Sequence, residues 1–195
     1  MTPDGAWLVV IDAQRAFAEP ESPWCVPAFG ETAQGIAALL PRFGPRVIFT
    51  RFVPPRDPPG SWHDYYGRWA FALAPEHAGL WDLVAPWAHR PSVDSHRFSK
   101  WGPALRRATA GASALVLCGV ATECCVLATA LAAVDGGAHV RVVADACGSK
   151  RPDLHRGTLA LLEGRAPQLV VTTLREELAG EGRAAWPVSS ASTTW

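Results

Sequence analysis

Short apolar runs alternate along the chain with longer segments whose apolar residues recur at helical spacing. The runs predict strands at residues 7–11, 46–50, 92–98, 114–118, 140–144 and 169–172. Continuous short runs of this kind are typical of strands buried on both faces of a parallel sheet. The periodic segments predict helices at residues 31–43, 81–88, 103–110, 122–134, 153–163 and 175–178.

Strands that alternate with helices predict an α/β fold, with right-handed crossovers and helices on both faces of one sheet. No internal repeat or linker divides the chain, so we expect a single domain over residues 1–179. Residues 180–195 are rich in Ala, Ser, Thr and Gly, and we expect a loose tail there. Residues 54–66, rich in Pro, Gly and aromatics, are predicted as an irregular loop.

The composition argues against two classes of binding partner, nucleic acids and membranes. The 195 residues include 18 Lys+Arg and 18 Asp+Glu, and this balance argues against nucleic acid. No apolar run approaches the roughly 20 residues of a membrane span, and residues 6–11 lack the basic flank of a signal peptide. We therefore expect a cytoplasmic protein without a membrane partner. The five cysteines, an odd number without a CxxC motif, fit reduced thiols. Nine tryptophans suggest an aromatic pocket or a subunit interface.

Three chemically distinct residues follow predicted strands. In such sheets ligands bind beyond the carboxyl ends of the strands. Asp12 follows the first strand, Lys100 the third, and Cys125 lies in the turn after the fourth, at the start of a predicted helix. A helix N-terminus favours the reactive thiolate, and its free N–H groups could hold an oxyanion. Taken singly, each residue also has an ordinary interpretation: a helix-capping acid, a solvated lysine, and a cysteine packed as a small hydrophobe. Together they suit nucleophilic catalysis.

A family resemblance rests on three stretches in this order. They are Val10-Ile11-Asp12-Ala13-Gln14 with Phe17, Phe98-Ser99-Lys100, and Gly119-Val120-Ala121-Thr122-Glu123-Cys124-Cys125-Val126 with Thr129-Ala130. From about Trp7 to Thr173 the chain resembles the isochorismatase-like cysteine hydrolase superfamily. That superfamily includes nicotinamidases, N-carbamoylsarcosine amidohydrolases and ureidoacrylate hydrolases.

The resemblance implies a three-layer fold with a six-stranded, mainly parallel sheet, and an Asp–Lys–Cys triad. By it, Asp12 is the base, Lys100 the stabilising cation and Cys125 the nucleophile. It also implies a cis peptide between Val120 and Ala121, and an oxyanion hole formed by the N–H groups of Ala121 and Cys125. Members are often dimeric or tetrameric, so we expect a homodimer or homotetramer.

Two adjacent cysteines compete for the role of nucleophile. The family's nucleophile precedes a valine and lies three residues after the threonine, as Cys125 does. Cys124 should then point about 100° away around the helix, into packing. Cys118 falls within a predicted buried strand and is expected in the core.

The chain departs from nicotinamidase-type relatives, which place Asp-x-His after the second strand to bind a metal. Residues 50–54 here contain neither ligand, and the six histidines show no metal-binding spacing. We therefore expect no catalytic metal and no other cofactor, and a substrate other than nicotinamide.

Aromatic residues after the first two strands are candidates for substrate binding. Trp62, Arg68 and Trp69 belong to the region that covers the active site in the family, and could bind a flat or apolar small molecule. They could equally anchor a surface loop. Phe17 and Trp24 are candidates from the segment after Asp12, although Trp24 also suits a subunit interface.

The sequence thus predicts a metal-independent hydrolase that cleaves a C–N bond, in a carboxamide or ureido group, through a thioester. A rival reaction is vinyl ether hydrolysis of isochorismate, with Arg51 or Arg68 binding its carboxylates. Relatives that catalyse this reaction can dispense with the cysteine, so the presence of Cys125 favours C–N cleavage. Two rival functions without hydrolysis are a catalytically silent binding protein and a thiol redox protein, the latter disfavoured by the absence of CxxC.

Overall fold

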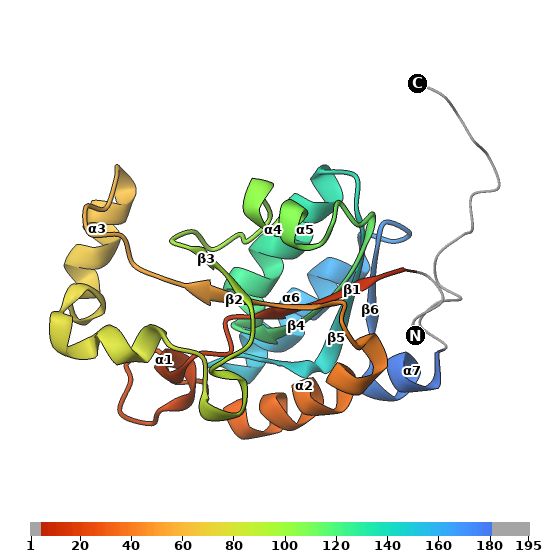
Figure 1. Ribbon diagram of the computed structural model, residues 1–195, viewed down its shortest axis with the longest axis horizontal. Helices are drawn as coiled ribbons and strands as arrows, with labels where there is room; N and C mark the ends of the chain where they lie inside the picture. Colours follow the sequence, from red (N-terminus) through yellow and green to blue (C-terminus); the bar gives the residue numbers. More distant parts are fainter. Residues whose placement is uncertain (1–4, 181–195) are drawn as a thin grey trace.

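A computed structural model describes residues 5–180, which form a six-stranded, all-parallel sheet between two layers of helices (Figure 1). The strand order is β3-β2-β1-β4-β5-β6. The strands are β1 (Trp7–Ile11), β2 (Val47–Phe52), β3 (Ser92–Ser95), β4 (Ala114–Val120), β5 (His139–Gly148) and β6 (Leu169–Thr172). The predicted α/β fold is confirmed. Because winding reverses between β1 and β4, the carboxyl ends of these two central strands form the switch point where ligands are expected.

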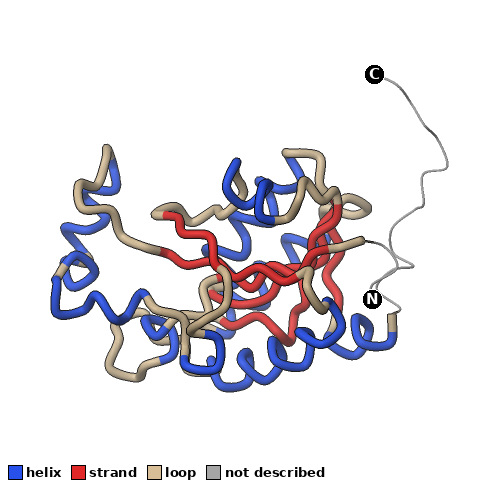
Figure 2. Tube along the Cα trace, in the orientation of Figure 1, coloured by secondary structure: helices blue, strands red, loops and turns tan. Residues whose placement is uncertain are grey.

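Helices cover both faces of the sheet, as the blue segments on either side of the red strands show (Figure 2). One layer holds α2 (Phe29–Phe43) and α7 (Leu174–Ala179), which contact each other and β5. The other layer holds α4 (Pro103–Ala108), α5 (Leu127–Asp135) and α6 (Pro152–Glu163). A single turn, α1 (Arg15–Ala18), follows β1.

A lobe of short helices projects beyond β2, at the left of Figure 1. It contains α3 (Ser61–Arg68) and 3₁₀ turns at Ala70–Leu73, Pro75–Trp81 and Ala85–Trp87. The prediction of an irregular loop over residues 54–66 is therefore wrong from Ser61 onward. Trp62 and Tyr66, one helical turn apart, stack with ring centroids 6.1 Å apart, and Tyr66 is buried. The aromatic residues that suggested a loop thus provide the apolar face of a helix.

The close approach of β1 and β4 depends on a glycine. Gly119 pairs with Ile11 and has a φ of +112°, a conformation that favours glycine. A Cβ added there would lie 2.1 Å from the Ile11 carbonyl oxygen. Glycine therefore allows the two strand ends, and the residues that follow them, to lie side by side.

Two sequence-based expectations reach beyond the described residues. The loose tail over 180–195 lies outside them except for Gly180, and the single-domain assignment stays a prediction. Within residues 5–180, no helix combines the length and apolar character needed to cross a membrane.

Candidate active site

Asp12 leaves β1 in a strained conformation. Its φ of +47° lies in the left-handed region, which residues other than glycine seldom adopt, and its side chain is fully buried. Thr50 on β2 forms hydrogen bonds with both the backbone and the side chain of Asp12. The Asp12 N–H donates to Thr50 Oγ1 over 3.2 Å, and Thr50 Oγ1 donates to Asp12 Oδ1 over 2.7 Å. The neighbouring strand therefore fixes the orientation of this carboxylate.

Lys100 reaches the same carboxylate from the loop after β3. Its Nζ lies 2.9 Å from Asp12 Oδ2, and neither side chain is exposed to solvent. The ammonium also donates to the Arg97 carbonyl oxygen over 2.8 Å and lies 4.8 Å from the centre of the Phe52 ring. The Lys100 N–H donates to Thr129 Oγ1 on α5 over 2.9 Å. These contacts hold the lysine as a fixed cation beneath the strand ends.

The two oxygens of Asp12 are not equivalent. Oδ1 accepts the Thr50 hydroxyl, whereas Oδ2 has the ammonium beside it but no aligned hydrogen bond among the described residues. A carboxylate oxygen held next to a cation in this way keeps a lone pair for a proton from a third group. Asp12 Oδ2 is therefore the atom best placed to act as a base.

Cys125 lies in a wide, π-type turn over Thr122–Val126 that precedes α5. The Ala121 carbonyl oxygen accepts the N–H groups of Cys124 over 3.0 Å and Val126 over 3.2 Å, which defines this turn. The peptide bond between Val120 and Ala121 is cis. Ala121 and Cys125 both line the same pocket, so the two residues expected to form the oxyanion hole share one floor.

The charges around Cys125 favour its protonated form. A hydrogen bond with the Cys124 thiol, burial, and the negative charge of Asp12 raise the pKa of Cys125 well above its ordinary value, and the positive charge of Lys100 only partly opposes them. Asp12, Lys100 and Cys125 therefore form one electrostatic unit. These charges favour the thiol over the thiolate at Cys125.

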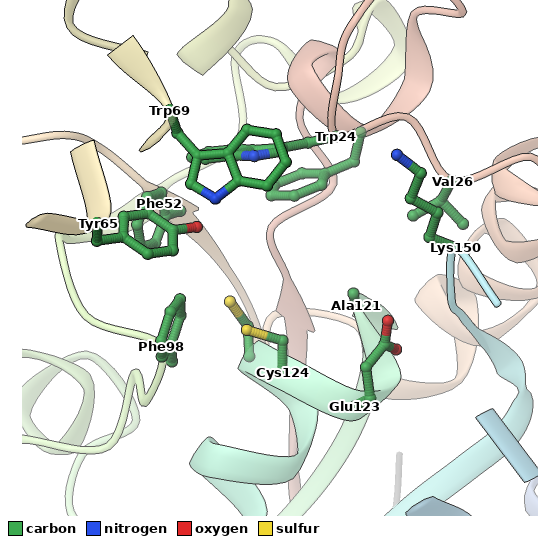
Figure 3. Close-up of a pocket in the computed structure, with 12 residues that line it drawn as sticks. Trp24, Val26, Phe52, Tyr65, Trp69, Phe98, Ala121, Glu123, Cys124 and Lys150 are labelled. Atoms are coloured by element: carbon green, nitrogen blue, oxygen red, sulfur yellow. The ribbon is translucent and has the colours of Figure 1, made fainter. Parts of the chain in front are cut away.

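The pocket is a cavity of about 190 Å³ with an aromatic wall. Figure 3 shows the aromatic side chains on one side of it, with Glu123 and Lys150 on the other. Asp12 and Lys100 do not line the cavity, because they are buried beneath it. Its lining consists of Phe17, Trp24, Val26, Phe52, Tyr65, Trp69, Phe98, Ala121, Glu123, Cys124, Cys125 and Lys150.

Comparison with known proteins agrees with this architecture. The family model described as the isochorismatase domain matches residues 6–176. The chain belongs to the isochorismatase family. Members of this family are hydrolases. No curated protein matches the chain significantly.

Solved structures show the isochorismatase fold at low sequence identity. A cysteine hydrolase from Pseudomonas syringae pv. phaseolicola 1448A is 23% identical with a TM-score of 0.77, over 95% of this chain and 96% of that one. Nicotinamidase from Bacillus subtilis is 21% identical with a TM-score of 0.68, over 86% and 99%. N-carbamoylsarcosine amidase from Thermoplasma acidophilum is 18% identical with a TM-score of 0.67, over 87% and 96%. At these identities the likeness supports the fold.

The candidate substrate-binding residues separate into two groups. Phe17, Trp24 and Trp69 line the pocket. Trp62 and Arg68 do not. Trp62 packs behind the wall, with its ring 4.8 Å from that of Phe98, and the Arg68 guanidinium lies over the Trp69 ring at 5.5 Å. These two residues therefore support the wall without forming it.

Cys124 corrects one sequence-based expectation. It was expected to point into packing, but it is only half-buried and lines the pocket beside Cys125. The expectation assumed ordinary helical spacing, and the π-type turn does not follow that spacing. Several other pocket residues had no distinguishing signal in the sequence, namely Val26, Tyr65, Glu123 and Lys150.

A nicotinamidase-type metal centre of the isochorismatase family does not fit residues 50–54, which begin near the end of β2 and continue beyond it. Thr50 is hydrogen-bonded to Asp12, and Arg51 forms an ion pair with Asp94 at 2.7 Å. Residues 50–54 offer no carboxylate or imidazole to a metal. In the described part of the chain, His, Cys, Asp and Glu side chains do not gather in threes as a ligand set.

Proposed function

We propose that this protein is a cysteine hydrolase that cleaves the C–N bond of a carboxamide or ureido group in a small molecule. One observation carries the proposal: the Asp12–Lys100 ion pair lies buried beneath a pocket whose floor contains Cys125. The charges of both partners act on the thiol. A base, a cation and a nucleophile at one point are what acyl transfer through a thioester requires.

In the first half of the reaction, Asp12 takes the proton of the Cys125 thiol as sulfur attacks the carbonyl carbon. The N–H groups of Ala121 and Cys125 stabilise the oxyanion of the tetrahedral intermediate. Asp12 then passes the proton to the leaving nitrogen, and ammonia or an amine departs. Lys100 holds Asp12 in place and limits the build-up of negative charge around two side chains that are buried from solvent.

In the second half, water attacks the thioester carbonyl carbon while Asp12 takes its proton. The carbon–sulfur bond then breaks, the acid product leaves, and the proton returns to the Cys125 sulfur. The raised pKa of Cys125 suits this sequence, because the site returns to a protonated thiol after each turnover.

The pocket favours a flat, largely apolar acyl group over the dianion isochorismate. Both arginines that could bind its carboxylates are engaged outside the pocket. Arg51 pairs with Asp94 and Asp82, and Arg68 lies over Trp69. We also infer a reducing compartment such as the cytoplasm, because all five cysteines are unbridged and the reaction uses a free thiol.

The test is a screen of primary amides, N-carbamoyl compounds and isochorismate, with release of ammonia and pyruvate measured in parallel. We expect ammonia from a small aromatic amide. Added hydroxylamine should trap the acyl group as a hydroxamate, which identifies a thioester.

Cys25→Ala, which removes a thiol outside this pocket, is the matched control for Cys125→Ala. Pyruvate without ammonia, or ammonia release that survives Cys125→Ala, would refute the proposal.

A further inference from the structure

Two consecutive thiols open on the same cavity. Cys124 and Cys125 are consecutive in the chain and both line it, and the neighbouring Cys124 thiol raises the pKa of Cys125. Figure 3 shows the Cys124 sulfur pointing into the cavity, on the side of Tyr65 and Phe98. Tyr65 lines the same cavity as the two cysteines, and burial together with Cys124 and Cys125 raises the pKa of its phenol. The pair therefore presents two sulfur atoms together at an accessible surface.

A direct bond between these sulfurs is geometrically unfavourable. Consecutive Cα atoms are about 3.8 Å apart, whereas disulfides ordinarily need about 4.4–6.8 Å. A single atom inserted between the sulfurs removes this difficulty, because each sulfur then bonds to the bridging atom. An atom that prefers two thiolate ligands would thus use the pair as it stands.

We propose that Cys124 and Cys125 form a two-sulfur binding site for trivalent arsenic compounds, with aryl arsenicals as the preferred ligands. Soft thiolates select thiophilic elements of this kind. In the reaction with R–As(OH)₂, two As–O bonds break and two As–S bonds form. The two thiol protons leave with the hydroxides as two waters, and arsenic stays trivalent, so no oxidant or reductant is needed.

The surroundings select the organic group on arsenic. The cavity of about 190 Å³ is lined by aromatic rings, and Trp24, Tyr65 and Phe98 stand on the side toward which Cys124 points. An aryl group would lie against these rings, where offset and edge-to-face contacts are favourable. The two thiols hold this ligand whatever reaction the site performs.

A second pair of neighbouring cysteines serves as a control. Cys118 and Cys147 lie close enough to interact electrostatically, but they are 0% and 7% exposed and belong to β4 and β5 in the core. Cys147 lines a different pocket while Cys118 is closed to solvent, so this pair does not present two sulfurs together to a ligand. Cys25 is half-buried and outside the active-site pocket.

The experiment adds one equivalent of phenylarsine oxide to the folded protein and follows the intact mass. We expect one phenylarsenic(III) unit bound with loss of two protons, in wild type, Cys25→Ala and Cys147→Ala alike. Either Cys124→Ser or Cys125→Ser should weaken binding by about 100-fold or more, because a single thiol loses the chelate. Dithiothreitol should release the adduct, and an equal thiol concentration of 2-mercaptoethanol should not.

Peptide mapping of the wild-type adduct gives a second readout that does not depend on how the variants fold. Iodoacetamide should fail to label Cys124 and Cys125 in the adduct while still labelling Cys25. The proposal is overturned by an adduct that persists in both serine variants, by its loss in Cys147→Ala, or by protection of Cys25 in the adduct. Because mass and labelling are measured, failure to find a substrate leaves this test unaffected.

Discussion

The Lys100 ammonium lies 2.9 Å from the Asp12 carboxylate, and both side chains are closed to solvent. Removing one partner of such a pair typically costs about 3–5 kcal/mol, whereas a matched apolar pair is often no less stable. Stability alone is therefore a weak reason for two buried charges here. Both charges act on the nearby Cys125 thiol, as the proposed reaction requires.

Substitution of Cys125 should lower turnover far more than substitution of Cys124. Cys125→Ala removes the attacking sulfur, and we expect turnover to fall by about 10⁴-fold or more with the fold intact. Cys124→Ala removes a pocket contact but leaves the nucleophile, so turnover should stay within about tenfold of wild type. Steady-state rates and circular dichroism of both variants check this. If Cys124→Ala proves to be the inactive variant, Cys125 is the wrong nucleophile.

Removing the charge of Asp12 and removing that of Lys100 should shift the pH at which Cys125 becomes reactive in opposite directions. Asp12 raises the pKa of this thiol and Lys100 lowers it. In Asp12→Asn, iodoacetamide labelling of Cys125 should therefore begin at lower pH than in wild type, although hydrolysis falls by about 10²–10⁴-fold for want of a base. In Lys100→Met, labelling should begin at higher pH.

The labelling profile is measured as the rate at Cys125 against pH, by mass spectrometry of the peptide that contains it. Thermal melts of each variant establish that the labelled protein is folded. Identical profiles in wild type and both variants, each resembling a free thiol near pH 8.5, would mean that the three residues do not form one site.

Hydrolysis should survive a chelator. Residues 50–54 contain no metal-binding side chain, Thr50 and Arg51 are engaged with Asp12 and Asp94, and no step of the proposed reaction uses a metal. We expect unchanged rates after dialysis against EDTA, with elemental analysis of the dialysed protein as the control. Loss of activity that zinc or iron restores would overturn this prediction.

The free energy of unfolding should fall in alkaline solution because two thiols, those of Cys118 and Cys147, are buried in the sheet. Burial raises the pKa of Cys147 to about 12, and burial together with Cys147 raises that of Cys118. Unfolded thiols lose their protons near pH 8.5, so above that pH the unfolded state is favoured until the folded thiols ionise as well. Each thiol contributes a decline of up to about 1.4 kcal/mol per pH unit.

Urea unfolding at several pH values from about 8 to about 10 measures this decline. In Cys147→Ala the free energy of unfolding should fall less steeply with pH than in wild type, because one proton-binding group is gone. Equal slopes in the two proteins would contradict the assignment.

We also expect the chain to self-associate as a homodimer or homotetramer. Leu154 and Leu161, one heptad apart on α6, are 39% and 44% exposed, which leaves apolar surface on the outer side of the helix layer. Light scattering at micromolar concentration measures the mass, and Leu161→Glu should reduce it if this face is buried between subunits. A wild-type monomer would rule out the expectation.

Much of the fold follows from local pattern. The runs at residues 7–11 and 169–172 coincide with β1 and β6, because a strand buried on both faces is apolar throughout. β5 extends four residues beyond its predicted end at residue 144. Its pairing with β4 resumes after a bulge, with Cys147 beside Gly119, and a bulge leaves no mark in the apolar pattern.

The candidate active site is harder to predict from the sequence than the fold is. Asp12, Lys100 and Cys125 are candidates because of their positions after strands and a family resemblance, and the structure brings them together, while their catalytic roles stay a prediction. Thr50, which fixes the Asp12 carboxylate, is one hydroxyl in an apolar strand and gives no signal. Cys124 was misplaced because helical spacing was assumed where the backbone makes a wider turn.

In the proposed reaction, the burial of Asp12 and Lys100 beneath the pocket separates proton transfer from substrate recognition. The ion pair lies at the carboxyl ends of β1 and β3, whereas much of the aromatic wall comes from the segment after β1 and from the lobe around α3. Changes in those segments can reshape what enters without disturbing the ion pair. To engineer the enzyme for substrates with other acyl groups, Trp24, Tyr65 and Trp69 are therefore the positions to substitute. The sheet can be left unchanged.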